Sequence, residues 1–122
     1  MGKQILIVDD SDTAVQTLRW YLQDGPFQVL TAKDGLAAVR MAHERHPDLI
    51  LMDLVMPVLD GLGAVRALKK AADTRGIPVI MVTTRDDPAE VERSYSVGCS
   101  DYVTKPVDRG ELLSKISWHL EL

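Results

Sequence analysis

Short, continuously apolar runs alternate with longer amphipathic stretches along the chain. Residues 5–8, 49–52 and 79–82 carry only apolar side chains, which is typical of strands covered on both faces in a parallel sheet. The stretches between such runs have helical spacing, and residues such as Pro88 and Gly98 suit a helix start and a helix end. The predicted strands are 4–8, 28–32, 49–52, 78–82 and 101–104, and the predicted helices are 12–23, 35–45, 61–72, 88–97 and 108–120.

This strict alternation predicts an α/β fold with one domain over residues 1–122. Helices that connect parallel strands cover both faces of the sheet, which gives a three-layer, doubly wound sandwich. For five strands and five helices the common strand order is 2-1-3-4-5, the flavodoxin-like arrangement.

The charge balance narrows the classes of partner. Lys and Arg number 14 and Asp and Glu 18, so the net charge is −4. Nucleic acids and anionic membranes attract clustered positive charge, so neither is expected as the main partner. The single cysteine, Cys99, excludes a disulfide within the chain, and no apolar run is long enough for a signal peptide or a membrane span. We therefore expect a cytoplasmic protein, either complete or part of a longer one.

Acidic side chains follow two strands that are predicted to be neighbours. Asp9 and Asp10 come directly after the first strand, and Asp53 comes directly after the third. With the order 2-1-3-4-5 these carboxylates meet at the edge of the sheet where ligands of such folds bind. Crowded carboxylates repel one another, and a hard divalent cation relieves the repulsion. The sequence therefore predicts a site for Mg²⁺, or for Mn²⁺ in its place.

Two further strand ends add groups that suit phosphoryl transfer. Thr83 and Thr84 follow the fourth strand and supply hydroxyl groups, and Lys105 follows the fifth strand and supplies a positive charge. An aspartate in this setting can attack phosphorus and become an acyl phosphate. The metal and the lysine would neutralise charge on the phosphoryl oxygens, so positioning and electrostatics carry the reaction.

Four segments at the strand ends carry a family resemblance. They read ILIVDDS at 5–11, LMDLVMPVLDG at 51–61, PVIMVTT at 78–84 and GCSDYVTKP at 98–106. Over essentially all of its length the chain resembles the receiver domain of two-component response regulators. Among these it is most similar to the single-domain forms of chemotaxis and twitching motility. Each motif alone is weak, but their order and spacing make the match specific.

The resemblance implies a role for each residue of the acidic cluster. Asp53 is expected to be the phosphoacceptor and Asp10 a direct metal ligand, whereas Asp9 would act partly through metal-bound water. The backbone carbonyl of Val55 would be a further metal ligand, and Lys105 would pair with the phosphoryl group.

The resemblance also implies a conformational switch. The hydroxyl of Thr83 would move toward the phosphate beside Thr84, and the ring of Tyr102 would swing inward. A plain half-buried strand position is the alternative interpretation of Tyr102. The structural assignments are a cis peptide between Lys105 and Pro106, Pro57 in the loop beside the acceptor, and Gly61 at the turn into the next helix.

Two positions depart from the commonest family patterns. Val55 replaces a polar side chain that is often found two residues after the acceptor, so it cannot orient an attacking water molecule. Thr84 is larger than the Ala or Gly frequent after the switch threonine and is expected to narrow access to Asp53. We therefore expect slow self-dephosphorylation.

The predicted function is a phosphorylation-dependent signalling switch. The donor would be a histidine kinase or a phosphotransfer protein, and the output would be contact with a protein target that the sequence does not name. A monomer, or a weak phosphorylation-dependent dimer, is expected, with no turnover of an external substrate. The alternatives are a receiver cut from a larger DNA-binding regulator or hybrid kinase, an aspartyl-phosphate phosphatase, and an FMN carrier. The phosphatase lacks its usual second acid at Val55, and in the FMN carrier Asp9 and Asp10 would repel the phosphate.

Several other residues have structural interpretations. Leu36 is expected on the apolar stripe of helix 35–45, and Trp20 is expected to be exposed on the first helix. His43 and His46 lie near a helix end, where positive charge complements the helix dipole, and are not expected to bind metal. The pair 69–70 is expected to form a solvated helix end.

Overall fold

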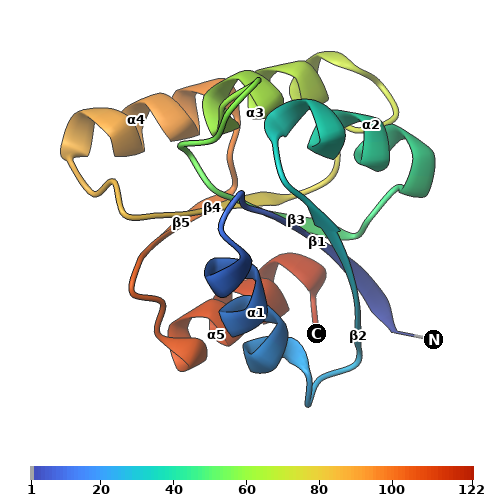
Figure 1. The fold of residues 1–122 in the computed structure, drawn as a ribbon. Helices are drawn as coiled ribbons and strands as arrows, with labels where there is room; N and C mark the ends of the chain where they lie inside the picture. The colour runs from blue at the N-terminus through green and yellow to red at the C-terminus, as the bar shows by residue number, and fades with distance from the viewer. Residues whose placement is uncertain (1) are drawn as a thin grey trace.

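The computed structural model describes residues 2–122, and over these residues the chain forms one parallel sheet covered by helices (Figure 1). The five strands of this part of the chain lie in the order β2-β1-β3-β4-β5, and every neighbouring pair is parallel. The predicted flavodoxin-like fold is therefore confirmed. The elements are β1 (Lys3–Val8), α1 (Asp12–Leu22), β2 (Phe27–Ala32), α2 (Gly35–Arg45), β3 (Leu49–Met52), α3 (Gly61–Lys70), β4 (Val79–Thr83), α4 (Pro88–Val97), β5 (Asp101–Thr104) and α5 (Arg109–Leu120).

The helices cover both faces of the sheet. Figure 1 shows α1 and α5 on one face and α2, α3 and α4 on the other. Successive side chains of a strand point to opposite faces, so Ile5 and Ile7 join the core with α1 and α5, while Leu6 and Val8 join the other core. Both sets are buried, which explains why this strand reads as a continuous apolar run.

Every helix of the described chain begins behind a capping residue. The side-chain oxygen of each cap accepts a hydrogen bond from the backbone N–H three residues later, which satisfies a donor that the helix leaves free. These bonds fix where each helix starts after the loop that follows a strand. The caps are Ser11, Asp34, Asp60, Asp87 and Asp108.

The third helix is shorter than predicted, because it ends at Lys70 and not at residue 72. The hydroxyl of Thr74 donates to the carbonyl of Leu68 at 2.7 Å, and Ala71 is already extended. The expectation of a solvated end at 69–70 is wrong for Lys69. This side chain is half-buried, and its Nζ donates to the carbonyls of Arg75 and Ile77 at 3.0 and 2.7 Å.

The predicted apolar stripe of the second helix is wrong at Leu36, whereas Ala42 is buried and Val39 packs against the core as predicted. The buried residues of this helix are Gly35, Ala38 and Ala42, while Leu36 is 41% exposed. The small residues let α2 approach its neighbours closely, and a Cβ at Gly35 would meet the carbonyl oxygen of Leu59 at 2.2 Å.

Trp20, on the first helix, is exposed, as predicted. In residues 2–122 no helix has the length and apolar character needed to cross a membrane.

Candidate functional site

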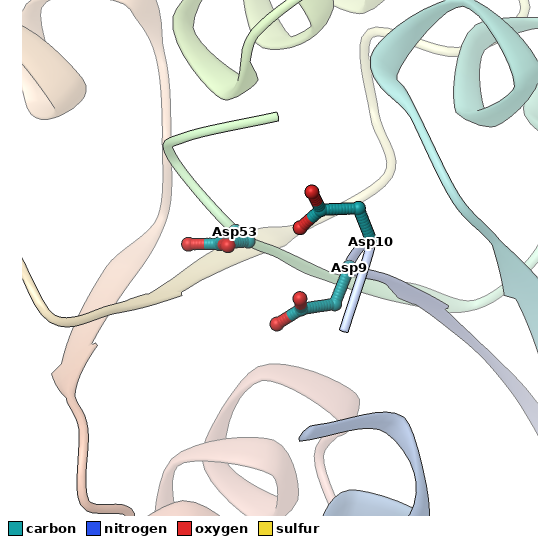
Figure 2. A group of neighbouring side chains, drawn as sticks. All are labelled: Asp9, Asp10 and Asp53. Atoms are coloured by element: carbon teal, nitrogen blue, oxygen red, sulfur yellow. The ribbon is translucent and has the colours of Figure 1, made fainter. Parts of the chain in front are cut away.

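The carboxyl ends of the strands bring the predicted acidic residues together. Val8 of β1 is paired with Met52 of β3, so the residues that follow them lie side by side. The N–H of Asp53 donates to the carbonyl of Val8 at 2.9 Å, which ties the two strand ends to each other. Figure 2 shows the side chains of Asp9, Asp10 and Asp53 gathered at this edge.

The three carboxylates are close enough to share a cation. Each offers one oxygen, and these oxygens all lie within 4.8 Å of one another. Asp9 and Asp53 are buried, whereas Asp10 is exposed. Crowded carboxylates with two buried members repel one another, and hard divalent cations take such oxygen ligands together with water. The donor set therefore fits a divalent metal of the Mg²⁺ class.

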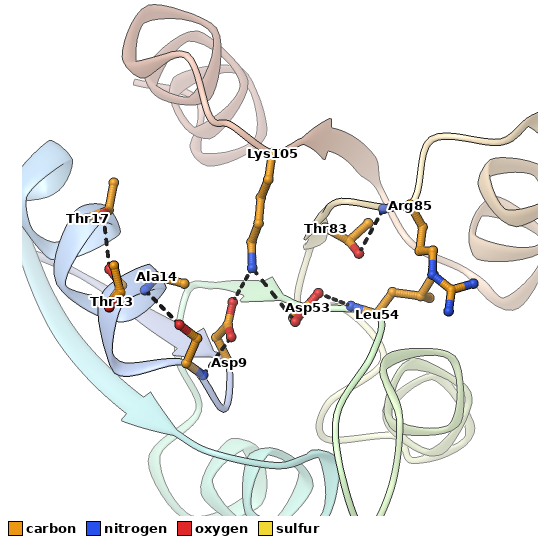
Figure 3. Close-up of polar contacts among 10 residues, drawn as sticks. Asp9, Thr13, Ala14, Thr17, Asp53, Leu54, Thr83, Arg85 and Lys105 are labelled. Carbon is orange, nitrogen blue, oxygen red and sulfur yellow. Dashed lines mark hydrogen bonds and ion pairs between the residues drawn. The ribbon is translucent and has the colours of Figure 1, made fainter.

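Lys105 supplies the positive charge of the site (Figure 3). Its Nζ lies 2.7 Å from Oδ2 of Asp9 and 3.8 Å from Oδ2 of Asp53, so it forms the tighter pair with Asp9. The backbone N–H of Lys105 donates to the carbonyl of Thr83 at 2.8 Å, which holds the end of β5 beside β4. The peptide between Lys105 and Pro106 is cis, as predicted.

Backbone N–H groups complete the carboxylate contacts, and the sequence analysis did not anticipate them. Oδ1 of Asp9 accepts from the N–H of Ser11 at 2.9 Å, and Oδ1 of Asp53 accepts from the N–H of Leu54 at 2.8 Å. Each bond leaves the other oxygen of its carboxylate facing Lys105. The only sequence signal for these contacts is that each donor lies one or two residues after the acid that it contacts.

Burial has the largest effect on the acid–base properties of Asp53. It raises the pKa of this carboxyl above the usual aspartate value, and the charge of Asp9 raises it further. Lys105 and hydrogen bonds from Thr83 and Leu54 act in the opposite direction without cancelling the effect of burial. The ionised carboxylate is therefore costly in the metal-free protein, and a cation at the site would relieve that cost.

We expect Asp53→Asn to stabilise the metal-free protein at neutral pH. The raised pKa means that the folded state holds the Asp53 proton to a higher pH than the unfolded state does. The free energy of unfolding therefore falls as the pH rises from the unfolded-state pKa, about 3.9, through the folded-state pKa. Urea unfolding in EDTA measures the effect. The variant should be more stable than wild type at neutral pH, and this difference should shrink as the pH falls below that window. A variant less stable than wild type at neutral pH would contradict the assignment.

Thr83 and Tyr102 are connected through the backbone of Arg85. The hydroxyl oxygen of Thr83 accepts from the N–H of Arg85 at 3.3 Å, and the hydroxyl of Tyr102 donates to the carbonyl of Arg85 at 2.5 Å. The ring of Tyr102 is buried, so the half-buried alternative underestimates its packing. Thr84, which lies between Thr83 and Arg85 in the sequence, is exposed. Arg85 is a contact that the sequence analysis missed, because backbone groups leave no residue-type signal.

The loop after Asp53 is held against the sheet. The N–H of Gly61 donates to the carbonyl of Leu54 at 2.9 Å, and a Cβ at Gly61 would meet the carbonyl oxygen of Asp53 at 2.4 Å. The side chain of Val55 is exposed, and Pro57 is also exposed within the loop. Gly61 therefore allows α3 to begin directly beside the acceptor loop.

Sequence comparison assigns the family. The family described as response regulator receiver domain matches residues 5–117. The chain is a response regulator receiver domain. The predicted family is thus confirmed.

Relatives of the receiver are known in sequence and in structure. Protein PilH of Pseudomonas aeruginosa PAO1 is 46% identical over 114 residues, which cover 93% of this chain and 94% of PilH. The chemotaxis protein CheY4 of Vibrio cholerae is 30% identical with a TM-score of 0.89, over 97% of this chain and 98% of CheY4. The receiver spans only about half, or less, of several other curated relatives, which are longer proteins.

One solved relative contains a metal ion. The receiver domain of a sensor histidine kinase from Pseudomonas aeruginosa PAO1 was crystallised with a magnesium ion coordinated in its active-site cleft. It is 31% identical to this receiver, with a TM-score of 0.92 and complete coverage of both chains.

Proposed function

We propose that this receiver is a phosphorylation-dependent switch in which Asp53 accepts a phosphoryl group from a phosphohistidine. The observation that carries the proposal is the convergence of three carboxylates within 4.8 Å with Lys105 directly beside two of them. The donor would be a histidine kinase or a phosphotransfer protein. We also propose that the receiver works in the cytoplasm.

The proposal also assigns the metal-binding residues, which the resemblance implies and the convergence of the three carboxylates supports. Asp10 is the exposed carboxylate and would bind Mg²⁺ or Mn²⁺ directly, together with Asp53 and the backbone carbonyl of Val55. Asp9 is already engaged by Lys105 and by the N–H of Ser11, so it would act partly through water. Bound there, the metal would neutralise negative charge on the phosphoryl oxygens.

The phosphoryl step needs an ionised Asp53 and a positive partner for the incoming group. One oxygen of Asp53 attacks phosphorus and forms an O–P bond, while the N–P bond of the phosphohistidine breaks. The electron pair of that bond stays on the imidazole nitrogen, and a ring that is protonated on its other nitrogen leaves as neutral histidine. Lys105, 3.8 Å from Oδ2 of Asp53, would pair with the transferred group.

The signal would leave the site through Arg85. A Thr83 hydroxyl drawn toward the phosphoryl group would weaken its contact with the N–H of Arg85, whose carbonyl binds the hydroxyl of Tyr102. Because Tyr102 belongs to β5 and Arg85 precedes α4, the surface of α4 and β5 would change. We propose that this surface binds a protein target, with no direct contact to nucleic acid. The receiver domain would extend over residues 1–122. It would act as a monomer or as a weak dimer that forms on phosphorylation.

The experiment that tests the proposal is intact-mass analysis after incubation with acetyl phosphate and Mg²⁺. We expect the mass to increase by one phosphoryl group, and EDTA to prevent the increase. If the folded protein gains no mass, repeating the reaction with a phosphorylated histidine kinase shows whether Thr84 blocks the small donor. No transfer from either donor would contradict the proposal. Continuous hydrolysis of a phosphomonoester would instead favour a phosphatase.

We expect Val55→Asn to shorten the lifetime of the phosphorylated receiver several-fold. The exposed side chain at position 55 lies two residues after Asp53, and an amide there can orient a water molecule that valine cannot. Release of inorganic phosphate from the purified phosphorylated protein measures the rate. Val55→Leu is the matched control and should release phosphate at the wild-type rate. Equal rates for the amide variant and wild type would show that this side chain does not limit hydrolysis.

A further inference from the structure

One carboxylate joins β5 to the helices on either side of it. Asp101 is the first residue of β5, and its Oδ1 accepts from the hydroxyl of Tyr95 on α4 at 3.4 Å. From α5, Nζ of Lys115 lies 3.2 Å from Oδ1 of Asp101, and Nε2 of His119 lies 3.0 Å from Oδ2. Figure 1 shows α4 and α5 on opposite faces of the sheet, so Asp101 connects helices from both faces at the edge strand.

The same carboxylate holds the backbone of Tyr102. Strand β5 lies at the edge of the described sheet, where outward-facing backbone groups have no strand to pair with. The N–H of Tyr102 donates to Oδ1 of Asp101 at 2.9 Å, and the carbonyl of Tyr102 accepts from Nζ of Lys115 at 2.8 Å. Because Lys115 also contacts Asp101, the three residues close a ring of contacts around the main chain of Tyr102.

The charged groups of this cluster are only partly exposed to solvent. The side chains of Asp101, Lys115 and His119 are 22%, 28% and 17% exposed, so salt screens their contacts less than those of a surface ion pair. Burial raises the pKa of the Asp101 carboxyl. Hydrogen bonds from His119, from the N–H of Tyr102 and from Lys115 outweigh burial, so this pKa lies below the usual aspartate value. The carboxylate is therefore ionised at neutral pH and attracts its partners on α5.

We propose that Asp101 is a positioning residue that holds α4 and α5 against β5 in the unphosphorylated conformation of the receiver. This inference rests on the proposed function, in which a change at Arg85 reaches Tyr102 and α4. A movement of α4 away from β5 would break the contact between the Tyr95 hydroxyl and Asp101. Contacts that one conformation makes and the other loses shift the equilibrium towards the first, so the contacts of Asp101 oppose the phosphorylated conformation.

The test is calorimetric titration of the full chain with beryllofluoride, a noncovalent analogue of the phosphoryl group, in excess Mg²⁺. Asp101→Asn keeps an oxygen for the N–H of Tyr102 but removes the charge that attracts Lys115 and His119. We expect the Kd of this variant to fall at least about fivefold, because the conformation that the ligand favours becomes easier to reach. The urea midpoint of the variant should fall as well. Tighter binding by a less stable protein distinguishes positioning from a merely structural role, since general loosening of the fold would weaken binding.

Tyr95→Phe is the second variant, because it removes only the hydroxyl with which an exposed side chain of α4 reaches Asp101. Its Kd should also fall, and it decides the question if Asp101→Asn does not fold.

Asp73→Asn is the matched control. Asp73 also contacts an imidazole, with Oδ2 2.7 Å from Nδ1 of His43, but it lies in the loop between α3 and β4. Its Kd should equal that of wild type. Equal or weaker binding by folded Asp101→Asn would overturn this inference alone. A wild-type protein that binds no beryllofluoride and gains no phosphoryl group would overturn the proposed function, and this inference with it.

Discussion

Asp53→Asn is expected to abolish the gain of a phosphoryl group from acetyl phosphate or from a phosphorylated kinase. The amide is nearly the same size as the carboxylate but carries no anionic oxygen that can attack phosphorus. Burial raises the pKa of the Asp53 carboxyl, which means that its ionised form is costly in the folded protein. The substitution removes this cost, so the variant should remain folded. Intact-mass analysis should show the unmodified mass under conditions in which wild type is modified to completion.

The control for this variant is Asp24→Asn. Asp24 is an exposed aspartate in the turn before β2, where it lies 3.8 Å from Arg109 and away from the acidic edge. This variant should accept a phosphoryl group as wild type does. A phosphoryl gain that survives in Asp53→Asn would place the acceptor on another side chain, and peptide mapping would identify it.

Gly61→Ala should lower the free energy of unfolding by about 1–3 kcal/mol, which is typical of overpacking in a well-packed core. Its Cβ would lie 2.4 Å from the carbonyl oxygen of Asp53, 2.9 Å from Cα of Leu54 and 2.8 Å from Cε of Met81. The methionine can move, but the two backbone atoms belong to the acceptor loop. Urea unfolding should therefore show a lower midpoint, and Mg²⁺ should bind more weakly because Asp53 shifts.

Gly76→Ala is the control for the steric argument. It is an exposed glycine in the loop before β4, and a Cβ there would meet nothing within 4 Å. The midpoint of this variant should stay close to that of wild type. If Gly61→Ala were as stable as Gly76→Ala, the backbone near Asp53 would be free to relax. The close approach of Gly61 to the carbonyl of Asp53 would then not be needed for stability.

The sheet and the acidic edge could be predicted because they depend on patterns that are local in the sequence. A strand that is covered on both faces must be apolar at every position, as residues 5–8 and 49–52 are. Polar side chains directly after such runs must emerge at the same edge once the strand order is given. The prediction of Asp9, Asp10 and Asp53 as neighbours required no side-chain geometry.

The features that were missed depend on contacts between distant segments or on backbone atoms. Helical spacing placed Leu36 on the core-facing stripe, but Gly35 and Ala38 are buried in its place, and Gly35 packs closely against the backbone of Leu59. Lys69 follows a regular helical pattern, and only the folded loop reveals the carbonyls that it binds. His43 was predicted only to complement the dipole at the end of its helix. Nothing in the sequence indicates that Asp73 lies beside it.

The contact between Thr83 and Tyr102 through Arg85 uses only main-chain atoms of the middle residue. Substitution of Arg85 by most other residues would therefore preserve the connection, since every residue except proline has both groups. The exposed guanidinium is then free to change from one receiver to another without loss of the internal signal. The surface that Arg85 presents to a partner can therefore change in evolution while the contacts of Thr83 and Tyr102 with its backbone stay the same.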